Sequence, residues 1–447
     1  MKEVLSSMKV RTVTYGVSLD PSDFENNGIK CQNKLEKSAK NLKFIVDNLI
    51  AGGYDVQTSR MTFNKIEDWL DLDKYKIQLE IIADIANKHN INIISLGSVT
   101  TTKYVPFIPK FFDISNKFFC AVQSSMGSDG IYDVPDYELC IEAAKVCLEM
   151  SRFNGNETGE SNFRFCIGFN IAPGGPFYPA SYYHTNHKDG VSIGLENGYF
   201  LFLAFHGVTE TVDTVDNVGD KSKIINKKAA FTQARNNLKD VIYQGIKPLQ
   251  IIVEGLCNQC DVLYMGVDAS LNPGLTQLDS IGAGIEWLVM PPEMQLEQID
   301  PDSKKYHTQR DEHSRSGYFG SFSTLSVVSL ITSVLKQLLA DDSDDSLKLV
   351  GYNGLMLPVM EDVVLAKRAA GNSNGPGFDI HNIAVQVNSN DSPPMYTLRD
   401  LLIFSTVCGV GLDTVPVPGG ISVEELANIY MEVGTLAFRL NKPLSCR

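Results

Sequence analysis

The sequence predicts an α/β fold built as one large unit, either a closed barrel or a doubly wound sheet. β-branched apolar runs alternate with segments of helical periodicity along the chain. No linker-like stretch divides the 447 residues, and 43% of them are hydrophobic, which is enough for a large core. Because parallel neighbours need crossover connections, the alternation indicates βαβ units. In both architectures the functional loops lie at the carboxyl ends of the strands.

The first part of the chain alternates regularly. Residues 10–18 are rich in β-branched side chains and predict a strand. Residues 34–49 place leucines at helical spacing ahead of Gly52 and Gly53, a typical helix end. The pattern repeats, with strands expected over 54–63, 91–98, 118–123 and 163–171, and helices over 75–89 and 137–152.

The second part is less regular. Residues 191–208 are apolar but contain Gly194 and Gly198, which predicts two extended pieces or one bent strand. A long helix kinked at Pro248 is expected over 227–258, followed by a strand over 261–271 and helices over 277–288 and 322–339. The remaining expected elements are strands over 347–359 and 410–417, a helix over 398–406, and a helix that the capping box of Ser422 and Glu425 opens. We treat residues 1–447 as a single domain with surface insertions near 154–161 and 291–315.

Charge and composition exclude several classes of protein. The 39 Lys and Arg against 53 Asp and Glu give a net charge of −14, which repels phosphate backbones and anionic membranes, so nucleic acid is not expected as a partner. The N-terminus lacks an apolar signal region, and no apolar run is long enough to span a membrane, so a cytoplasmic protein is expected. The nine cysteines are sparse and odd in number, which predicts reduced thiols.

The stretch 176–190, PFYPASYYHTNHKDG, holds the strongest candidate for chemistry. His184 and His187 lie three residues apart among three tyrosines, a lysine and Asp189, just ahead of an apolar run. Imidazole has a pKa near neutrality, so the two rings can act as acid, base or metal ligands. The alternative is a polar loop at a strand entrance in which both rings are hydrogen-bonded or solvated.

Further candidates lie at or just after expected strands. With the two histidines, Asp268, Glu361 and Asp413 would supply ligands to a divalent metal or a general acid and base. They also fit structural roles, Asp268 in a turn, Glu361 at a helix start and Asp413 as an acceptor for loop amides. Cys408 sits beside Gly409 and Gly411 and is either a buried inert thiol or a nucleophile with a lowered pKa.

Well-known catalytic signatures are missing. The sequence contains no GxSxG elbow, no HExxH and no GxGxxG placed between a strand and a helix. Cys257 and Cys260 form a CxxC, which is either redox-active, half of a zinc site or a pair of small buried thiols. No second ligand pair at zinc spacing is evident, so the structural interpretation is favoured.

Several segments resemble those of a known family. They are RTVTYGVS from Arg11, VDASLNPG from Val267, LPVMED from Leu357 and CGVGLDTVPVP from Cys408, and PFYPASYYH resembles a fifth segment through Pro176, Phe177, Ala180 and His184. In their order along the chain, these segments are similar to those of the domain of unknown function 711 family, which is described as pyruvate-formate-lyase-like. The resemblance implies a ten-stranded α/β barrel like that of glycyl radical enzymes, and assembly into homo-oligomers. The chain ends in NKPLSCR without an RVxGY-type radical segment, so a glycyl radical is not expected, although Cys408 resembles the catalytic thiol of those enzymes.

Together these observations predict an enzyme, lyase-like or hydrolase-like, that acts on a small polar metabolite at a barrel mouth. His184 would be the acid, base or metal ligand, Cys408 the nucleophile, and Glu361 and Asp413 carboxylate partners. A divalent metal, if present, would bind His184, His187 and Asp268. The alternative is a non-catalytic barrel that binds a metabolite as a sensor or scaffold oligomer. The enzyme hypothesis requires His184 and at least one of the carboxylates to face one cavity.

Overall fold

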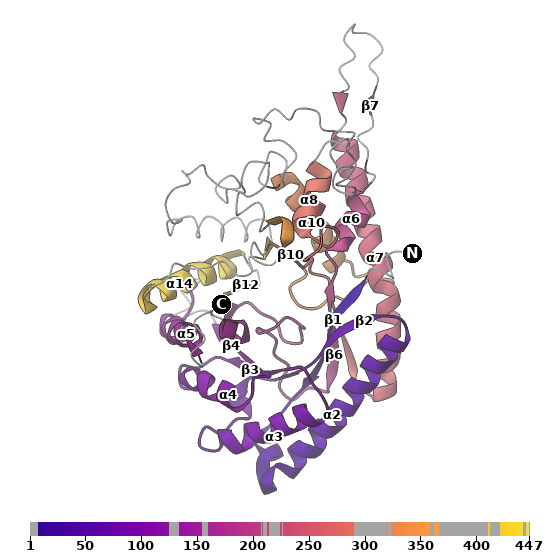
Figure 1. Ribbon diagram of the computed structural model, residues 1–447. Helices are drawn as coiled ribbons and strands as arrows, with labels where there is room; N and C mark the ends of the chain where they lie inside the picture. The colour runs from indigo at the N-terminus through magenta and orange to yellow at the C-terminus, as the bar shows by residue number, and fades with distance from the viewer. Residues whose placement is uncertain are drawn as a thin grey trace.

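The computed structural model describes residues 8–124, 134–153, 160–206, 208, 212–213, 224–225, 227–289, 319, 324–357, 362–365, 410–411, 421–440 and 444–446. Over these residues the chain forms a mixed α/β fold around an eight-stranded sheet, with helices packed along the sheet (Figure 1). The α/β class predicted from the sequence is therefore confirmed.

The sheet has two parts that run in opposite directions. Five parallel strands form the first part, in the spatial order β5 (Phe165–Phe169), β4 (Phe118–Ser124), β3 (Ile93–Val99), β2 (Asp55–Phe63) and β1 (Lys9–Val17). β6 (Gly190–Glu196) pairs antiparallel with β1, and β9 (Leu263–Asp268) runs parallel to β6. At the other edge, β12 (Leu444–Cys446) pairs antiparallel with β5.

The expectation of parallel βαβ units throughout is wrong at β6. The chain leaves the carboxyl end of β5 and returns through residues 170–189 without a helical crossover. It enters β6 at Gly190, which pairs with Gly16 at the carboxyl end of β1. Without a crossover to the other end of the sheet, β6 can only run back along β1 in the opposite direction.

Further pairings extend the second part of the sheet beyond β9. Two parallel bridges join β9 and its continuation to the segment after α10, Val267 to Leu349 and Leu271 to Leu355. That segment ends in β10 (Leu355–Met356), which pairs parallel with β11 (Val410–Gly411). Among the described residues β11 and β12 are not paired with each other, so the closed ten-stranded barrel that the resemblance implies is not confirmed by these pairings.

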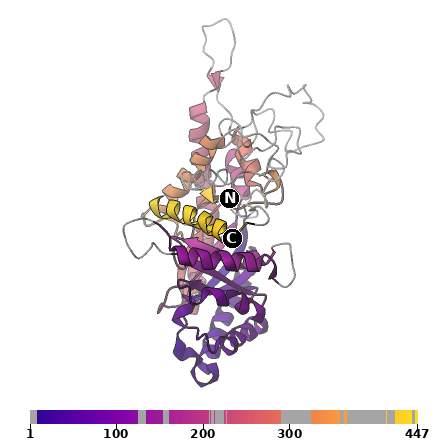
Figure 2. The same cartoon turned by 90° about the vertical axis from the view of Figure 1, so that its left-hand side faces the viewer.

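The helices that connect the first strands lie along one face of the sheet, and α14 lies beside α5 in both views (Figures 1 and 2). The α-helices are α2 (Glu25–Ala51), α3 (Tyr75–Lys88), α4 (Ile108–Ile114), α5 (Tyr137–Met150), α6 (Tyr199–Phe205), α7 (Lys227–Cys260), α8 (Ile281–Val289), α10 (Thr324–Leu339) and α14 (Val423–Leu440). Short 3-10 helices are η1 (Pro21–Phe24), η2 (Ile66–Asp68), η3 (Val105–Phe107) and η5 (Glu160–Arg164), and β7 (Val212–Asp213) pairs with β8 (Ile224–Ile225) in a separate small sheet. None of the helices in the described part of the chain combines the length and apolarity needed to cross a membrane.

Most predicted elements lie within a few residues of the observed ones, including the helix opened by the capping box. There the Glu425 amide donates to Ser422 Oγ at 3.1 Å and the Ser422 amide donates to Glu425 Oε2 at 2.8 Å. α7 continues through Pro248.

Two predicted extended stretches differ from the structure. The second half of 191–208 is the helix α6. Its short run YFLFLAF is apolar throughout, so it has no periodicity by which the sequence could distinguish a buried helix from a strand. The strand expected over 347–359 is reduced to bridges and β10, because Gly351 and Asn353 have positive φ values of 90° and 48°. The expected helix 398–406 and the insertion 291–315 lie outside the described residues, as do residues 154–159 of the other insertion.

The hydrophobic core lies between the sheet and the helices. Val13, Tyr15 and Val17 of β1 belong to the same buried cluster as Leu35 and Leu42 of α2. A second, smaller cluster joins Ala121 of β4 and Cys166 of β5 to residues 171–182 of the β5–β6 connection. The connection therefore packs on the face of the sheet opposite the helices.

Candidate functional site

The helix-free face of β1 and β2 is polar. Thr12 and Thr14 of β1 are buried and their hydroxyls lie 3.2 Å apart, and Thr58, Arg60 and Thr62 follow the same alternation on β2. Strands covered on both faces are usually apolar throughout. Polar side chains at every second position therefore indicate that this face lines a site rather than a packed core.

The β5–β6 connection, residues 170–189, covers this face, and we call it the interior loop. The Tyr178 hydroxyl donates to the Met61 carbonyl at 2.6 Å, the Ser95 hydroxyl donates to the Ser181 carbonyl at 2.5 Å, and the Tyr183 amide donates to the Phe63 carbonyl at 2.8 Å. Gly16 lets the loop approach, because a Cβ there would lie 2.1 Å from the Tyr183 ring. The loop is thus fixed to β2 and β3 along its length.

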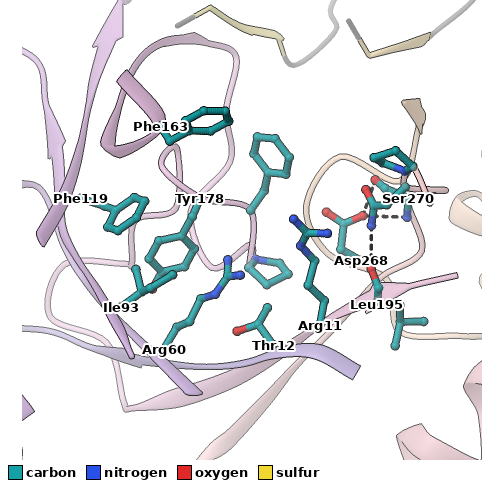
Figure 3. Close-up of a pocket in the computed structure, with 15 residues that line it drawn as sticks. Arg11, Thr12, Arg60, Ile93, Phe119, Phe163, Tyr178, Leu195, Asp268 and Ser270 are labelled. Carbon is teal, nitrogen blue, oxygen red and sulfur yellow. Dashed lines mark hydrogen bonds between the residues drawn. The ribbon is translucent and has the colours of Figure 1, made fainter. Parts of the chain in front are cut away.

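Part of the interior loop and both parts of the sheet enclose a cavity of about 310 Å³ (Figure 3). It lies near the amino ends of β1, β3 and β4, beside Arg60 in the second half of β2, and at the carboxyl ends of β6 and β9, which run in the opposite direction. Its lining residues are Arg11, Thr12, Arg60, Ile93, Phe119, Phe163, Pro176, Phe177, Tyr178, Gly194, Leu195, Asp268, Ser270, Asn272 and Pro273.

Arg60 is a buried cation in this cavity, with 9% of its surface exposed. Its Nε donates to Thr58 Oγ1 at 3.0 Å, and its guanidinium carbon lies 4.9 Å from the centre of the Tyr178 ring. Burial lowers the pKa of Arg60 to about 10; the neighbouring Tyr178 acts against this shift and the charge of Arg11 adds to it. The group is still protonated at neutral pH, and no carboxylate among the described residues pairs with it.

Arg11 lies at the rim of the same cavity and is partly exposed. Its Nη1 is 3.7 Å from Glu196 Oε2, a carboxylate that also accepts from Gln57 at 2.9 Å and lies 3.7 Å from Lys9 Nζ. Glu196 is therefore shared among three donors, and its charge compensates that of Arg11 only in part.

Asp268 contributes a buried carboxylate on the opposite wall. Its Oδ1 accepts from the Ser270 amide at 2.9 Å, the Ser270 hydroxyl at 2.5 Å and the Asn353 amide at 3.1 Å, and its Oδ2 accepts from the Tyr352 amide at 3.1 Å. Burial raises the pKa of Asp268, and these hydrogen bonds act in the opposite direction. Asp268 therefore orders the 351–354 turn and also faces the cavity, where Oδ2 retains capacity for a further donor.

The two walls of the cavity differ in polarity. Ile93, Phe119 and Phe163 form one side next to Tyr178, whose ring meets that of Phe119 edge-on with centroids 6.0 Å apart (Figure 3). On the other side lie Asp268, Ser270 and Asn272, and the Asn272 amide group donates to the Leu195 carbonyl at 2.6 Å. The arginines stand between the two sides (Figure 3). Such a cavity can orient a small molecule that has one apolar and one polar end.

His184 and His187 do not line this cavity. Their rings lie 4.9 Å apart, beside Tyr183, at the end of the interior loop where the Asn186 amide donates to Ser18 Oγ at 2.8 Å. Burial, and to a lesser extent His187, lowers the pKa of His184. The expected convergence of His184 and Asp268 on one cavity is not seen here, because the loop joins β6 at Gly190, which pairs with the start of β9, whereas Asp268 is at its end.

The predicted metal set of His184, His187 and Asp268 is not gathered. Over the described ranges of the chain, no three His, Cys, Asp or Glu side chains are close enough to hold a metal ion. Burial raises the pKa of both CxxC thiols, that of Cys257 to about 12, which favours the structural interpretation of this pair.

Glu361, Cys408 and Asp413 lie outside the described residues, so their roles stay predictions. The neighbour of Glu361, Asp362, is fully buried and accepts from the Ser280 hydroxyl at 2.6 Å and the Ile281 amide at 2.7 Å. Asp362 thus anchors the first turn of α8 and has a structural role.

Sequence reasoning missed the two arginines. Arg11 belongs to a segment that carries the family resemblance, and Arg60 lies in a strand that the sequence predicts only as an element. The signal was the alternation of Thr58, Arg60 and Thr62 in an interior strand. The stretch 176–190 does reach the cavity, but through Pro176, Phe177 and Tyr178 rather than through its histidines.

Comparison with known proteins gives a family. The family model described as Uncharacterised ACR (DUF711) matches residues 4–292 and 384–447. All residues that line the cavity fall within the first matched span.

Curated relatives carry the name UPF0210 protein. One from Clostridium perfringens is 23% identical over 262 residues, which cover 57% of this chain and 46% of the relative. One from Pyrobaculum arsenaticum is 23% identical over 284 residues, 64% of this chain and 48% of the relative. One from Caldicellulosiruptor saccharolyticus is 19% identical over 461 residues, 99% of this chain and 85% of the relative. The chain spans about half the length of the first two relatives.

Proposed function

Since the chain belongs to the Uncharacterised ACR (DUF711) family, we propose from its cavity that it is an enzyme acting on a small polar metabolite. The observation that carries the proposal is the buried charge of Arg60, which no carboxylate among the described residues pairs, in a cavity of about 310 Å³. A buried charge without a partner destabilises a fold, so its presence in a cavity of metabolite size supports a binding role.

Asp268 is the proposed acid or base of this site. Burial raises the pKa of this carboxyl, which moves it toward the range where one group can both accept and release a proton. It faces the same cavity as Arg60, whose charge would stabilise negative charge that develops on the substrate. Proton transfer of this kind is compatible with the lyase or hydrolase chemistry expected from the sequence.

We further infer that the sheet closes into a ten-stranded barrel around the interior loop. Five parallel strands in one direction, β1 to β5, are flanked on both sides by strands of the other direction, β6 and β12. β9, β10 and β11 follow β6 in parallel, so β11 and β12 also share a direction. Pairing of these two would complete two opposed halves of five strands, with the cavity at one mouth.

Glu361 and Asp413 remain candidate partners in this arrangement. Glu361 follows β10 by five residues and Asp413 follows β11 by two, and both strands run in the direction of β9, which ends at Asp268. Cys408 precedes β11 and keeps its proposed role as a nucleophile only if the chain brings it to the same mouth.

The test is conversion of metabolites by the full chain. Purified protein is incubated with a defined pool of small polar metabolites, and mass spectrometry identifies any compound that is consumed. Ile93→Trp fills the cavity, and Ile77→Trp makes the same change at a residue on α3 that is 63% exposed. We expect consumption by the wild type and by Ile77→Trp, and its loss in Ile93→Trp. Equal activity in all three proteins would place the function elsewhere.

The second candidate function is a non-catalytic metabolite sensor or scaffold oligomer. The observation that favours it is the full engagement of Asp268 Oδ1, which accepts three hydrogen bonds from Ser270 and Asn353. A carboxylate held in this way serves the 351–354 turn first. Saturable binding of a metabolite that is recovered unchanged, abolished in Ile93→Trp, would support this candidate over the enzyme.

A further inference from the structure

We propose that the ligand of this cavity is an organic oxyanion, a carboxylate or phosphate monoester that carries an aromatic or branched apolar group. Its oxyanion binds Arg60 and Arg11, and its apolar group lies against Ile93, Phe119 and Phe163. This inference rests on the proposed function, because it names the substrate class of the same site.

Among the residues that the structure describes, none offers the Arg60 guanidinium the oxyanion partner that its geometry suits. Among the described residues only its Nε donates a hydrogen bond, to the Thr58 hydroxyl, and its guanidinium carbon lies 4.9 Å from the centre of the Tyr178 ring. A guanidinium presents a planar fork of donors that matches the two oxygens of a carboxylate or phosphate. At 9% exposure, water cannot fully solvate it, so an entering oxyanion gains both charge neutralisation and hydrogen bonds.

A second cation faces the same space. Arg11 lines the cavity from β1, one position before Thr12, and β1 pairs with β2, the strand that carries Arg60. Two like charges that share a cavity repel each other, and the 3.7 Å contact with Glu196 compensates the charge of Arg11 only in part. A ligand with one or two negative charges removes the repulsion and binds both side chains.

The side chains of the two cavity walls indicate the chemistry of the rest of the ligand. Phe163 exposes 45% of its surface beside Phe119, so an apolar group placed there would remove hydrophobic area from water. On the opposite side, the carboxylate of Asp268 repels a second anion and accepts from a hydroxyl or amino group. Along the cavity the lining side chains therefore change from apolar to cationic to anionic (Figure 3). This order fits a ligand that has one apolar end and a single oxyanion group.

The test uses three probes of similar shape, namely 3-phenylpropionate, phenyl phosphate and the neutral 3-phenylpropionamide. Ligand-observed NMR titrations in Tris chloride measure the dissociation constants of the wild type, Arg60→Met, Arg11→Met and the cavity-filling variant Ile93→Trp. Arg235→Met, an exposed arginine on α7, is the matched control. Thermal unfolding of each variant confirms that it is folded.

We expect both oxyanions to bind the wild type at least about tenfold more tightly than the amide, since hydrogen bonds between two charged groups are stronger than those to a neutral group. Arg60→Met is expected to weaken oxyanion binding by roughly 10- to 100-fold and to leave amide binding unchanged. Arg11→Met, at the rim, is expected to weaken it by about 2- to 10-fold. Arg235→Met should behave as the wild type.

Three results would overturn this reasoning: the first two would overturn the substrate class, and the third would overturn the cavity as the binding site. If the amide binds as tightly as the oxyanions, or if Arg60→Met binds oxyanions as the wild type does, the substrate class is wrong while the cavity can still be the metabolite site. If Ile93→Trp binds every probe as the wild type does, the cavity is not the binding site and the proposed function is wrong with it. A preference of the two arginines for phenyl phosphate over 3-phenylpropionate, or the reverse, assigns the type of oxyanion.

Discussion

Replacing Arg60 with methionine should stabilise the protein while it weakens the proposed anion site. Methionine keeps the length of the aliphatic stem beside Tyr178 but removes a buried charge that has no carboxylate partner in the described part of the chain. The change also removes the hydrogen bond from Arg60 Nε to Thr58. Sites that bind ligands often hold such destabilising groups, and their removal commonly raises stability at the expense of function.

The magnitude follows from the pKa of Arg60. Burial lowers it from 12.5 to about 10, and at about 1.4 kcal/mol per pH unit the charged form opposes folding by about 3 kcal/mol. Loss of the hydrogen bond to Thr58 lowers the stability by about 1 kcal/mol, so the substitution should raise the free energy of unfolding by about 2 kcal/mol in total. With an unfolding entropy of about 2.1 cal/mol/K per residue, this gain raises the melting temperature of a 447-residue chain by about 2 °C.

Differential scanning calorimetry in Tris chloride, free of organic anions, measures the effect. Below the folded-state pKa of about 10 the arginine is protonated in both the folded and the unfolded protein, so the gain should be the same from about pH 6 to about pH 9. Arg235→Met is the control, because an exposed arginine should change stability by less than about 0.5 kcal/mol. A fall of the melting temperature in Arg60→Met would show that the charge of Arg60 is compensated, and the argument for an anion site would fail with it.

Three further predictions concern the frame of the site. Gly97→Ala should destabilise the fold by more than about 3 kcal/mol in thermal unfolding, because its Cβ would lie 1.9 Å from the Asn64 carbonyl oxygen at a φ of 101°. Gly53 is the control: its φ is 92° but its Cβ would meet open space, so Gly53→Ala should cost only about 1–2 kcal/mol. Equal losses of stability in the two variants would contradict the clash at Gly97. Asp362→Asn should cost about 2–4 kcal/mol in the same assay, since the amide cannot accept all the donors around α8, whereas a neutral result would deny this anchoring role. His184 should titrate below pH 6.5 by NMR, so that its contribution to stability falls as pH drops below that value, and His187→Gln should raise the midpoint; an unmoved midpoint would exclude the contribution of His187.

The two histidines show how far a residue pattern reaches towards function. His184 and His187 are adjacent in space as well as in sequence, with rings 4.9 Å apart, and the chemical role of this histidine pair stays a prediction. Its assignment to the same cavity as Asp268 depended on the direction of β6, and that direction is antiparallel to β1. Local spacing carries no information on strand direction, because direction depends on how distant segments pair.

The sequence by itself determined the local elements: the strands of the first half, the helices between them, and the helix start at Ser422 and Glu425. These depend on side-chain periodicity and capping within a few residues, which the chain carries wherever it folds. Only the tertiary structure decided that the interior loop returns the chain antiparallel and that Arg11 and Arg60 share one cavity with Asp268. Arg60 and Asp268 are more than 200 residues apart in the chain, and only the pairing of β1 with both β2 and β6 joins the walls that carry them.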